Sequence, residues 1–185
     1  MAPEKSRNKQ ILLANAMLAL GIAIIFLIVN NMKSFLDMAM LSASTITLFY
    51  FWWAYLFIAM KELGKNRIQD YLYDFFALIL LLGLFYLTGS SLENKALLWL
   101  INYFVLFIAA ILKNVFMKIG EKNKRKIRFL KKKIKIDIEA SVFIAILIFI
   151  AISFKLELFA IWSIFLMEFL HMLWVGFVTK LYEKY

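Results

Sequence analysis

Residues 156–178 read LELFAIWSIFLMEFLHMLWVGFV, an apolar run of the length that crosses a bilayer as one helix. Near its middle the run holds Glu168 and His171, which is the only histidine of the chain. An ionised side chain at the centre of a membrane helix costs roughly 2.5–3.5 kcal/mol on insertion scales, so these two side chains need partners or a task. The run therefore predicts a membrane-spanning helix with a polar centre.

The rest of the chain has the same character. Of its 185 residues 64% are hydrophobic, against about 45–50% apolar residues in a soluble domain. Six runs are long and apolar enough to cross a membrane: 11–29, 36–60, 70–88, 96–112, 136–154 and 156–178. Little chain remains for a soluble domain. We expect an all-α fold, an integral membrane bundle of six transmembrane helices that forms a single domain over 1–185.

The distribution of the 22 Lys and Arg residues predicts the orientation of this bundle. Three of them, Lys33, Lys95 and Lys155, lie in the connections on one side, and the other nineteen lie in 1–10, 61–69, 113–135 and 179–185. Connections rich in basic residues stay in the cytoplasm. We therefore expect a multi-pass protein of the plasma membrane with both termini cytoplasmic.

The spans are predicted to be continuous helices. Pro3 is the only proline, so no span carries a proline kink. Glycine is sparse as well, whereas transporters with broken helices carry Gly or Pro interruptions. In the first span Asn15, Ala19 and Ala23 recur at helical spacing, and such small residues favour close packing against another helix.

The segment 113–135 is the one sizeable loop and is strongly basic. Ile127, Leu130 and Ile134 recur at helical spacing among its charges, which predicts an amphipathic helix lying on the anionic inner leaflet. The expected lipid contacts are Arg125, Lys126, Arg128, Lys131, Lys132 and Lys133. Docking of an acidic protein partner is the alternative. Nucleic acid is not an expected partner, because Phe129 is the only aromatic residue in the basic core.

Polar side chains in the other runs define a candidate path for a solute. Asp37 and Ser44 lie on one face of the second span, and Asn102 lies about two turns inside the fourth. Asp74 and Glu139 stand where the third and fifth spans begin, at the expected cytoplasmic mouth. The alternative is structural: Ser and Asn form interhelical hydrogen bonds, and acids in a first turn complement the helix dipole and pair with lysines.

Glu168 and His171 allow three interpretations. Their spacing places both on one helix face. They can bond to each other or to another helix, with Asn15, Asn102 or Tyr103 as candidate partners. They can instead form a proton or cation relay. A metal site is the third reading, but the Glu-x-x-His spacing of di-iron bundles occurs only once here, so no metal and no other cofactor is expected.

The sequence favours transport of protons, a cation or a small solute over catalysis. The chain has no cysteine, no glycine-rich phosphate loop, and no nucleophile–base–acid set beyond His171. One rival interpretation is a non-catalytic subunit or scaffold of a membrane complex, with homo-oligomers or membrane proteins as partners. The other is a membrane-embedded lipid-modifying enzyme.

Overall fold

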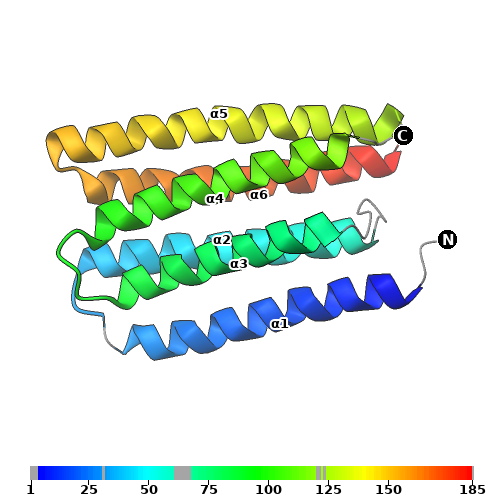
Figure 1. Cartoon of the computed structure of the whole chain (residues 1–185). Coiled ribbons are helices and arrows are strands. Elements are labelled where there is room, and N and C mark those ends of the chain that lie inside the picture. Colours follow the sequence, from blue (N-terminus) through cyan, green and yellow to red (C-terminus); the bar gives the residue numbers. More distant parts are fainter. Residues whose placement is uncertain (1–3, 31, 61–67, 120–121, 123, 185) are drawn as a thin grey trace.

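The computed structural model describes residues 4–30, 32–60, 68–119, 122 and 124–184, and these residues form an all-helical protein. The six helices are α1 (Glu4–Val29), α2 (Phe35–Met60), α3 (Ile68–Gly89), α4 (Lys95–Lys118), α5 (Lys124–Phe154) and α6 (Glu157–Lys184). The helices lie along a common direction, and each runs antiparallel to the next (Figure 1). The first turn of α1, the last turns of α2, α4 and α6, and the first turns of α3 and α5 share one end. We call this the basic end, and the opposite one the far end.

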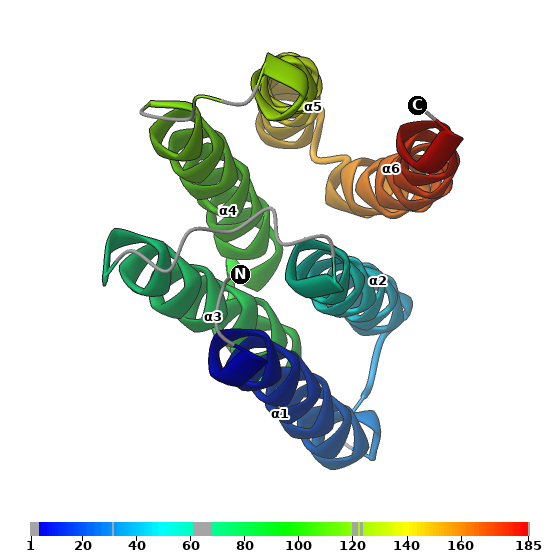
Figure 2. The ribbon, with the colours of Figure 1, turned by 90° about the vertical axis from the view of Figure 1, so that its right-hand side faces the viewer.

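Helices α2 and α4 form the centre of the bundle. Seen along the bundle, α2 lies between α1, α3 and α6, and α4 lies between α3 and α5 (Figure 2). Helix α1 contacts only α2 and α3 over the described residues and therefore stands at the edge. The largest fully buried side chains come mainly from α2, α3, α4 and α6, among them Met40, Leu48, Phe85, Trp99 and Ile161.

Within the described residues, three helical segments are long and apolar enough to cross a membrane: Phe35–Trp53, Lys95–Lys118 and Leu130–Phe154. Two shorter apolar segments, Asn15–Val29 and Tyr73–Gly89, belong to α1 and α3. Large apolar side chains also cover the outer faces, for example Phe26, Tyr86, Phe149 and Leu166. Such a surface is stable only in an apolar medium, and this indicates a membrane protein.

The basic segment differs from its prediction. Helix α4 continues to Lys118, and α5 starts at Lys124 and runs for 31 residues without a break. The basic residues are helical, as expected, but they form the first turns of α5 itself and not a helix of the loop; their contact with the inner leaflet stays a prediction. At 1.5 Å per residue α5 is about 46 Å long, which is more than the roughly 30 Å of hydrocarbon in a bilayer, so a membrane would not cover its whole length. Lys and Arg have high helix propensity, and this favours the continuation.

The packing face of α1 also differs from its prediction. Ala19 and Ala23 are exposed, whereas Met17 and Gly21 face the bundle. A Cβ atom on Gly21 would stand 2.2 Å from Leu48 Cδ2 of α2, so this glycine permits the close approach of the two helices. Asn15 is exposed, yet its Oδ1 accepts a 3.2 Å hydrogen bond from Trp52 Nε1 of α2.

Candidate functional site

A buried carboxyl group occupies the middle of the bundle. Glu168 of α6 is 0% exposed, and its Oε1 accepts a hydrogen bond from the hydroxyl of Tyr103 on α4, which is equally buried. The second oxygen, Oε2, is buried and accepts no hydrogen bond from the described residues. Of the three partners expected for the Glu168–His171 pair, Tyr103 is thus the one that bonds to Glu168. The free oxygen can hold a proton or bind a cation, because nothing else satisfies it.

An aromatic row on α4 positions this hydroxyl. Trp99, Tyr103 and Phe107 follow at intervals of four residues and therefore share one helix face. Their neighbouring ring centroids are 5.3 Å apart in both pairs. Trp99 Nε1 donates a 3.0 Å hydrogen bond to Ser44 Oγ of α2, which fixes the row against a second helix. The Tyr103 ring is therefore held on both faces, and its hydroxyl has little freedom to leave Glu168.

His171 lies one turn from Glu168 toward the basic end. It is 8% exposed, and its ring lies 4.9 Å from the Tyr50 ring of α2 and 6.5 Å from the Phe107 ring of α4, measured between centroids. The imidazole is thus enclosed by aromatic side chains from two other helices. Both members of the predicted pair face the interior.

A polar cluster follows between His171 and the basic end. It consists of Tyr50, Lys133, Asp137 and Asn114, and we call it the lysine cluster. Lys133 Nζ donates to the Tyr50 hydroxyl at 3.1 Å and lies 3.3 Å from Asp137 Oδ1. Asn114 Nδ2 donates to Asp137 Oδ2 at 2.7 Å. Both oxygens of the buried Asp137 carboxylate are therefore satisfied, and the cluster connects α2, α4 and α5.

A second ion pair stands opposite the lysine cluster. Lys113 of α4 bonds to Asp74 of α3, and both side chains are mostly buried. Next to this pair the Tyr73 ring of α3 packs on Phe116 of α4, with centroids 5.6 Å apart. Asp74 is thus paired with a lysine, as the structural alternative for this residue expects, and its place at a cytoplasmic mouth stays a prediction.

A cavity of about 70 Å³ separates the two ion pairs. Side chains from α2, α3, α4, α5 and α6 line it, and they include Asp74, Lys113, Lys133, Asp137 and His171. Its deeper wall is apolar, with Leu106 and Phe107 of α4. One water occupies about 10–15 Å³ on this scale, so the cavity has room for several waters or a small organic group. Glu168 does not line it; Phe107 and Tyr103 lie between.

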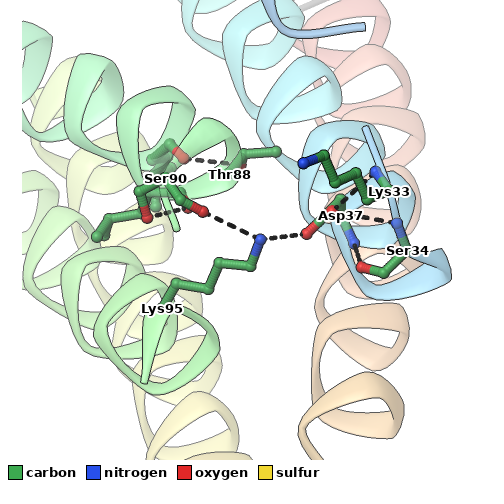
Figure 3. A network of polar contacts seen from close by, with 8 residues as sticks. Lys33, Ser34, Asp37, Thr88, Ser90 and Lys95 are labelled. Atoms are coloured by element: carbon green, nitrogen blue, oxygen red, sulfur yellow. Dashed lines mark hydrogen bonds and ion pairs between the residues drawn. The ribbon is translucent and has the colours of Figure 1, made fainter. Parts of the chain in front are cut away.

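At the far end, Ser34, Asp37, Ser90 and Lys95 form a polar network that we call the Asp37 clasp (Figure 3). Ser34 Oγ accepts the backbone N–H of Asp37 at 3.1 Å, and Asp37 Oδ2 accepts the backbone N–H of Ser34 at 3.2 Å, which is the reciprocal arrangement of a capping box. Asp37 Oδ1 lies 2.5 Å from Lys95 Nζ of α4, which also donates to the Ser90 carbonyl after α3 at 3.2 Å. Asp37 therefore caps α2 and ties three helices together.

Two of the predicted path residues lie away from the centre. Asn102 Nδ2 donates a 2.7 Å hydrogen bond to the Leu80 carbonyl of α3, as an interhelical bond does. Glu139 points outward: its side chain is 62% exposed and lies 3.8 Å from Lys135. The structure therefore gathers Glu168, His171, Ser44 and Asp74 along the interior and leaves Asn102 and Glu139 outside this line.

The predicted lipid contacts divide into two groups. Arg128, Lys131 and Lys132 are exposed on α5, while the side chains of Arg125 and Lys126 lie outside the described residues. Lys133 differs, because its side chain is only 19% exposed and belongs to the lysine cluster. Sequence reasoning missed this role for Lys133 and for Asp137. The signal was available: Leu130, Lys133, Asp137, Ser141 and Ile144 follow one another by three or four residues and form one helix face.

Fold and site define an all-helical membrane protein whose interior carries a buried carboxyl, a histidine and two ion pairs. Comparison of the chain with protein-family models, with characterised proteins and with solved structures gives no match. Among the described residues, no three His, Cys, Asp or Glu side chains are grouped so that they could hold a metal ion.

Proposed function

We propose that the chain is a small transport protein for protons, a cation or a small solute, with Glu168 and His171 as its proton- or cation-binding pair. The observation that supports this proposal is that the buried carboxyl group of Glu168 lies just beyond the cavity that His171 lines. The cavity is lined by Lys113 and Lys133 toward the basic end and by His171, and one helical turn beyond His171 Glu168 stands fully buried with no hydrogen bond to Oε2 from the described residues. An ionisable residue inside a membrane costs free energy, and such residues usually have a functional role.

The membrane arrangement belongs to the same proposal. All six helices span the plasma membrane as one domain, with both termini and the basic end in the cytoplasm. The start of α1 and the end of α6 lie at the same end of the bundle, which supports this arrangement (Figure 1). Nineteen of the 22 basic residues belong to segments on that side, as expected for cytoplasmic segments. The exposed Arg128, Lys131 and Lys132 then face the anionic inner leaflet, where each contributes on the order of 1 kcal/mol.

The interior between α2, α4 and α6 is solidly packed in the far half, and the cavity of about 70 Å³ lies nearer the basic end; the hollow of about 670 Å³ at the far end is an open groove between α1 and α3. Trp99, Leu100, Ile161 and Met40 fill the far half and are fully buried, and the Asp37 clasp ties the helices beyond them. Glu168 itself is sealed in this state, because Phe107 and Tyr103 lie between it and the cavity, and we propose that it is reached from the basic end, past His171, when these rings move. Release on the other side requires the far half to open. A sealed central site that opens to one side at a time is what alternating access requires, and this is part of the proposal.

Proton flux tests the proposal. The full chain is reconstituted in phosphatidylcholine liposomes that enclose a pH-sensitive dye, and a valinomycin-driven potassium gradient supplies the driving force. We expect flux from the natural chain and none from Glu168→Gln, since glutamine keeps the acceptor for Tyr103 and loses the titratable group. His171→Ala should slow the flux. Parallel assays with labelled sodium and potassium cover the cation case.

Glu139→Gln is the matched control for Glu168→Gln. It makes the same chemical change at the exposed carboxyl of α5, outside the candidate site. Flux of the control should equal that of the natural chain. Equal flux in the natural chain and in Glu168→Gln would contradict the proposal, provided that both proteins elute as folded species in size-exclusion chromatography.

The orientation can be tested separately. The chain contains no cysteine, so single cysteines are clean reporters. In intact cells a membrane-impermeant maleimide should label Lys33→Cys at the far end and leave Lys122→Cys at the basic end unlabelled until the cells are opened. The reverse pattern would place the basic end outside.

A second candidate function is a non-catalytic subunit of a membrane complex. The observation that favours it is the solid packing of the far half, where Ser44, Trp99 and Ile164 are 0% exposed. A chain with this role would show no flux of protons or cations when reconstituted alone. Co-purification with one defined membrane protein, together with absent flux, would select this candidate.

A further inference from the structure

We infer that the cavity at the basic end binds an amphipathic zwitterion: an ammonium group and an anionic group next to an apolar chain. The inference names a substrate class for the cavity and rests on the proposed transport function for the role of that ligand. Three features of the cavity support it: the net charge of its lining, the placement of the charged groups on two walls, and the position of the charged and apolar side chains along the bundle axis.

The charged groups that line the cavity cancel. Lys113 and Lys133 carry two positive charges, and Asp74 and Asp137 carry two negative charges, so these four groups sum to zero. Inside a low-dielectric bundle an ion of net charge would remain partly uncompensated, and this costs several kcal/mol even after relaxation. A ligand of net zero charge avoids that cost. The lining therefore favours a ligand of net zero charge as the resident occupant of the cavity.

The cancelling charges come as two pairs on different walls. Asp74 and Lys113 join α3 to α4, and Lys133 and Asp137 lie on α5. Each pair offers a carboxylate for an ammonium group and an ammonium for an anion. A zwitterion between the walls can bond to a cation of one pair and a carboxylate of the other, and it leaves no buried charge alone. Bonds of this kind between charged groups are about twice as strong as neutral ones.

The charged groups of the lining lie toward the basic end, while most of the cavity surface is apolar. Lys113 and Asn114 stand about two helical turns, roughly 10 Å, closer to the basic end than Leu106 and Phe107 of the same helix. The charged groups thus mark the outer part, which Tyr73, Ala109 and Ala110 also line, and Leu106 and Phe107 mark the inner part beside His171. A ligand that fits has its zwitterionic head outward and a short apolar group inward, toward His171.

Two sources supply this chemistry. One is a free solute such as an apolar α-amino acid, and the other is a lipid whose head group carries a primary ammonium beside a phosphate. A choline head group has no N–H donor for the carboxylates. Phosphatidylethanolamine and phosphatidylcholine therefore separate the lipid source from a general membrane effect.

Equilibrium dialysis of the purified full chain tests the inference. The probes are labelled L-leucine and its two single-charge analogues, 4-methylpentanoate and 3-methylbutylamine, and the detergent is supplemented with phosphatidylethanolamine or phosphatidylcholine. We expect saturable leucine binding and roughly tenfold or greater weakening for each analogue, because each lacks one charged hydrogen-bonding group. Competition by phosphatidylethanolamine alone assigns the site to the lipid, and absence of competition assigns it to the free solute; both support a zwitterion site.

The double variant Asp74→Asn/Lys113→Gln removes one ion pair without leaving a single buried charge. It should weaken leucine binding about tenfold or more. The matched control Lys135→Gln/Glu139→Gln neutralises the exposed pair of α5 and should bind as the natural chain does. Thermal unfolding verifies that both variants fold.

Three results would overturn the inference: no saturable binding of leucine or of phosphatidylethanolamine, equal binding of the analogues, or unchanged binding by the Asp74/Lys113 variant. The proposed function fails by a different measurement, namely flux that ignores Glu168→Gln. Dialysis needs no flux, so a chain that binds leucine and moves no protons keeps the site and loses the transport role. A chain whose flux depends on Glu168 but that binds no zwitterion keeps the transport role and loses the zwitterion site.

Discussion

The hydroxyl of Tyr103 donates a hydrogen bond to Glu168, and this bond joins the two helices α4 and α6 at the most deeply buried acid of the described chain. The contact is the single direct hydrogen bond that the described residues give to this carboxyl group. It therefore sets the position of Glu168 and decides which oxygen remains available. Both helices reach the site through side chains that are 0% exposed.

Tyr103→Phe removes this bond and leaves both carboxyl oxygens buried without a donor. We expect the free energy of unfolding to fall by about 1–2 kcal/mol, the range for interhelical hydrogen bonds and for stranded buried polar groups. Unfolding in mixed micelles, followed by tryptophan fluorescence, measures the change. Tyr86→Phe is the control, because Tyr86 is exposed on the outer face of α3.

The double variant Tyr103→Phe/Glu168→Leu sharpens this test. Replacing both partners by apolar groups removes the stranded oxygens, so most of the lost stability should return. A double variant less stable than Tyr103→Phe alone would show that Glu168 has a further stabilising contact.

Lys133→Met tests the lysine cluster. The substitution leaves Asp137 buried with Asn114 as its remaining partner, and we expect a loss of roughly 3 kcal/mol, as for a broken buried ion pair. Lys131→Met, two residues away and exposed, should change stability by less than about 0.5 kcal/mol. Equal losses in the two variants would contradict the inward position of Lys133.

Asp37→Asn tests the far-end clasp. Asparagine can still cap the backbone of α2, but it cannot pair with Lys95, so the ion pair is removed and the cap is kept. We expect a loss of roughly 1–3 kcal/mol, since Lys95 then stands mostly buried without its counter-charge. Ser34→Ala removes the cap and should cost about 1 kcal/mol. Glu93→Gln, exposed in the α3–α4 connection, should have no effect.

Gly21→Ala tests the close approach of α1 and α2. The added methyl group meets Leu48, which is 1% exposed and has no open space to enter. We expect a loss of about 1–3 kcal/mol, as for an overpacked core. The double variant Gly21→Ala/Leu48→Ala should separate the clash from the backbone effect, because the smaller residue 48 accepts the methyl group. A neutral Gly21→Ala would mean that α1 shifts freely on the bundle edge.

Helix positions are predictable in this chain because each apolar run must be helical once it lies in hydrocarbon. The structure confirms a helix over each of the six predicted runs, with longer ends at the basic side. The break expected between the basic segment and the fifth run is absent. Charge pattern alone cannot distinguish a helix that lies on a membrane surface from one that continues out of it, since both need the same apolar stripe.

The site was only partly predictable for a related reason. Glu168 and His171 stand out because ionisable groups are rare in apolar runs, and Tyr103 was one of the named partners. Lys133 does not stand out among three consecutive lysines. Which of the three faces inward depends on the rotation of α5 against α2 and α4, and that rotation is set by the packing of distant helices.

Helix α5 passes without interruption from its exposed basic turns to the wall of the cavity. A continuous helix bends little along its axis, so its two ends move together as one rigid body. Any partner or lipid surface that tilts the turns around Arg128 moves Lys133 and Asp137 by the same rotation. A displacement of the most basic part of the chain would therefore reach two of the charged side chains that line the cavity.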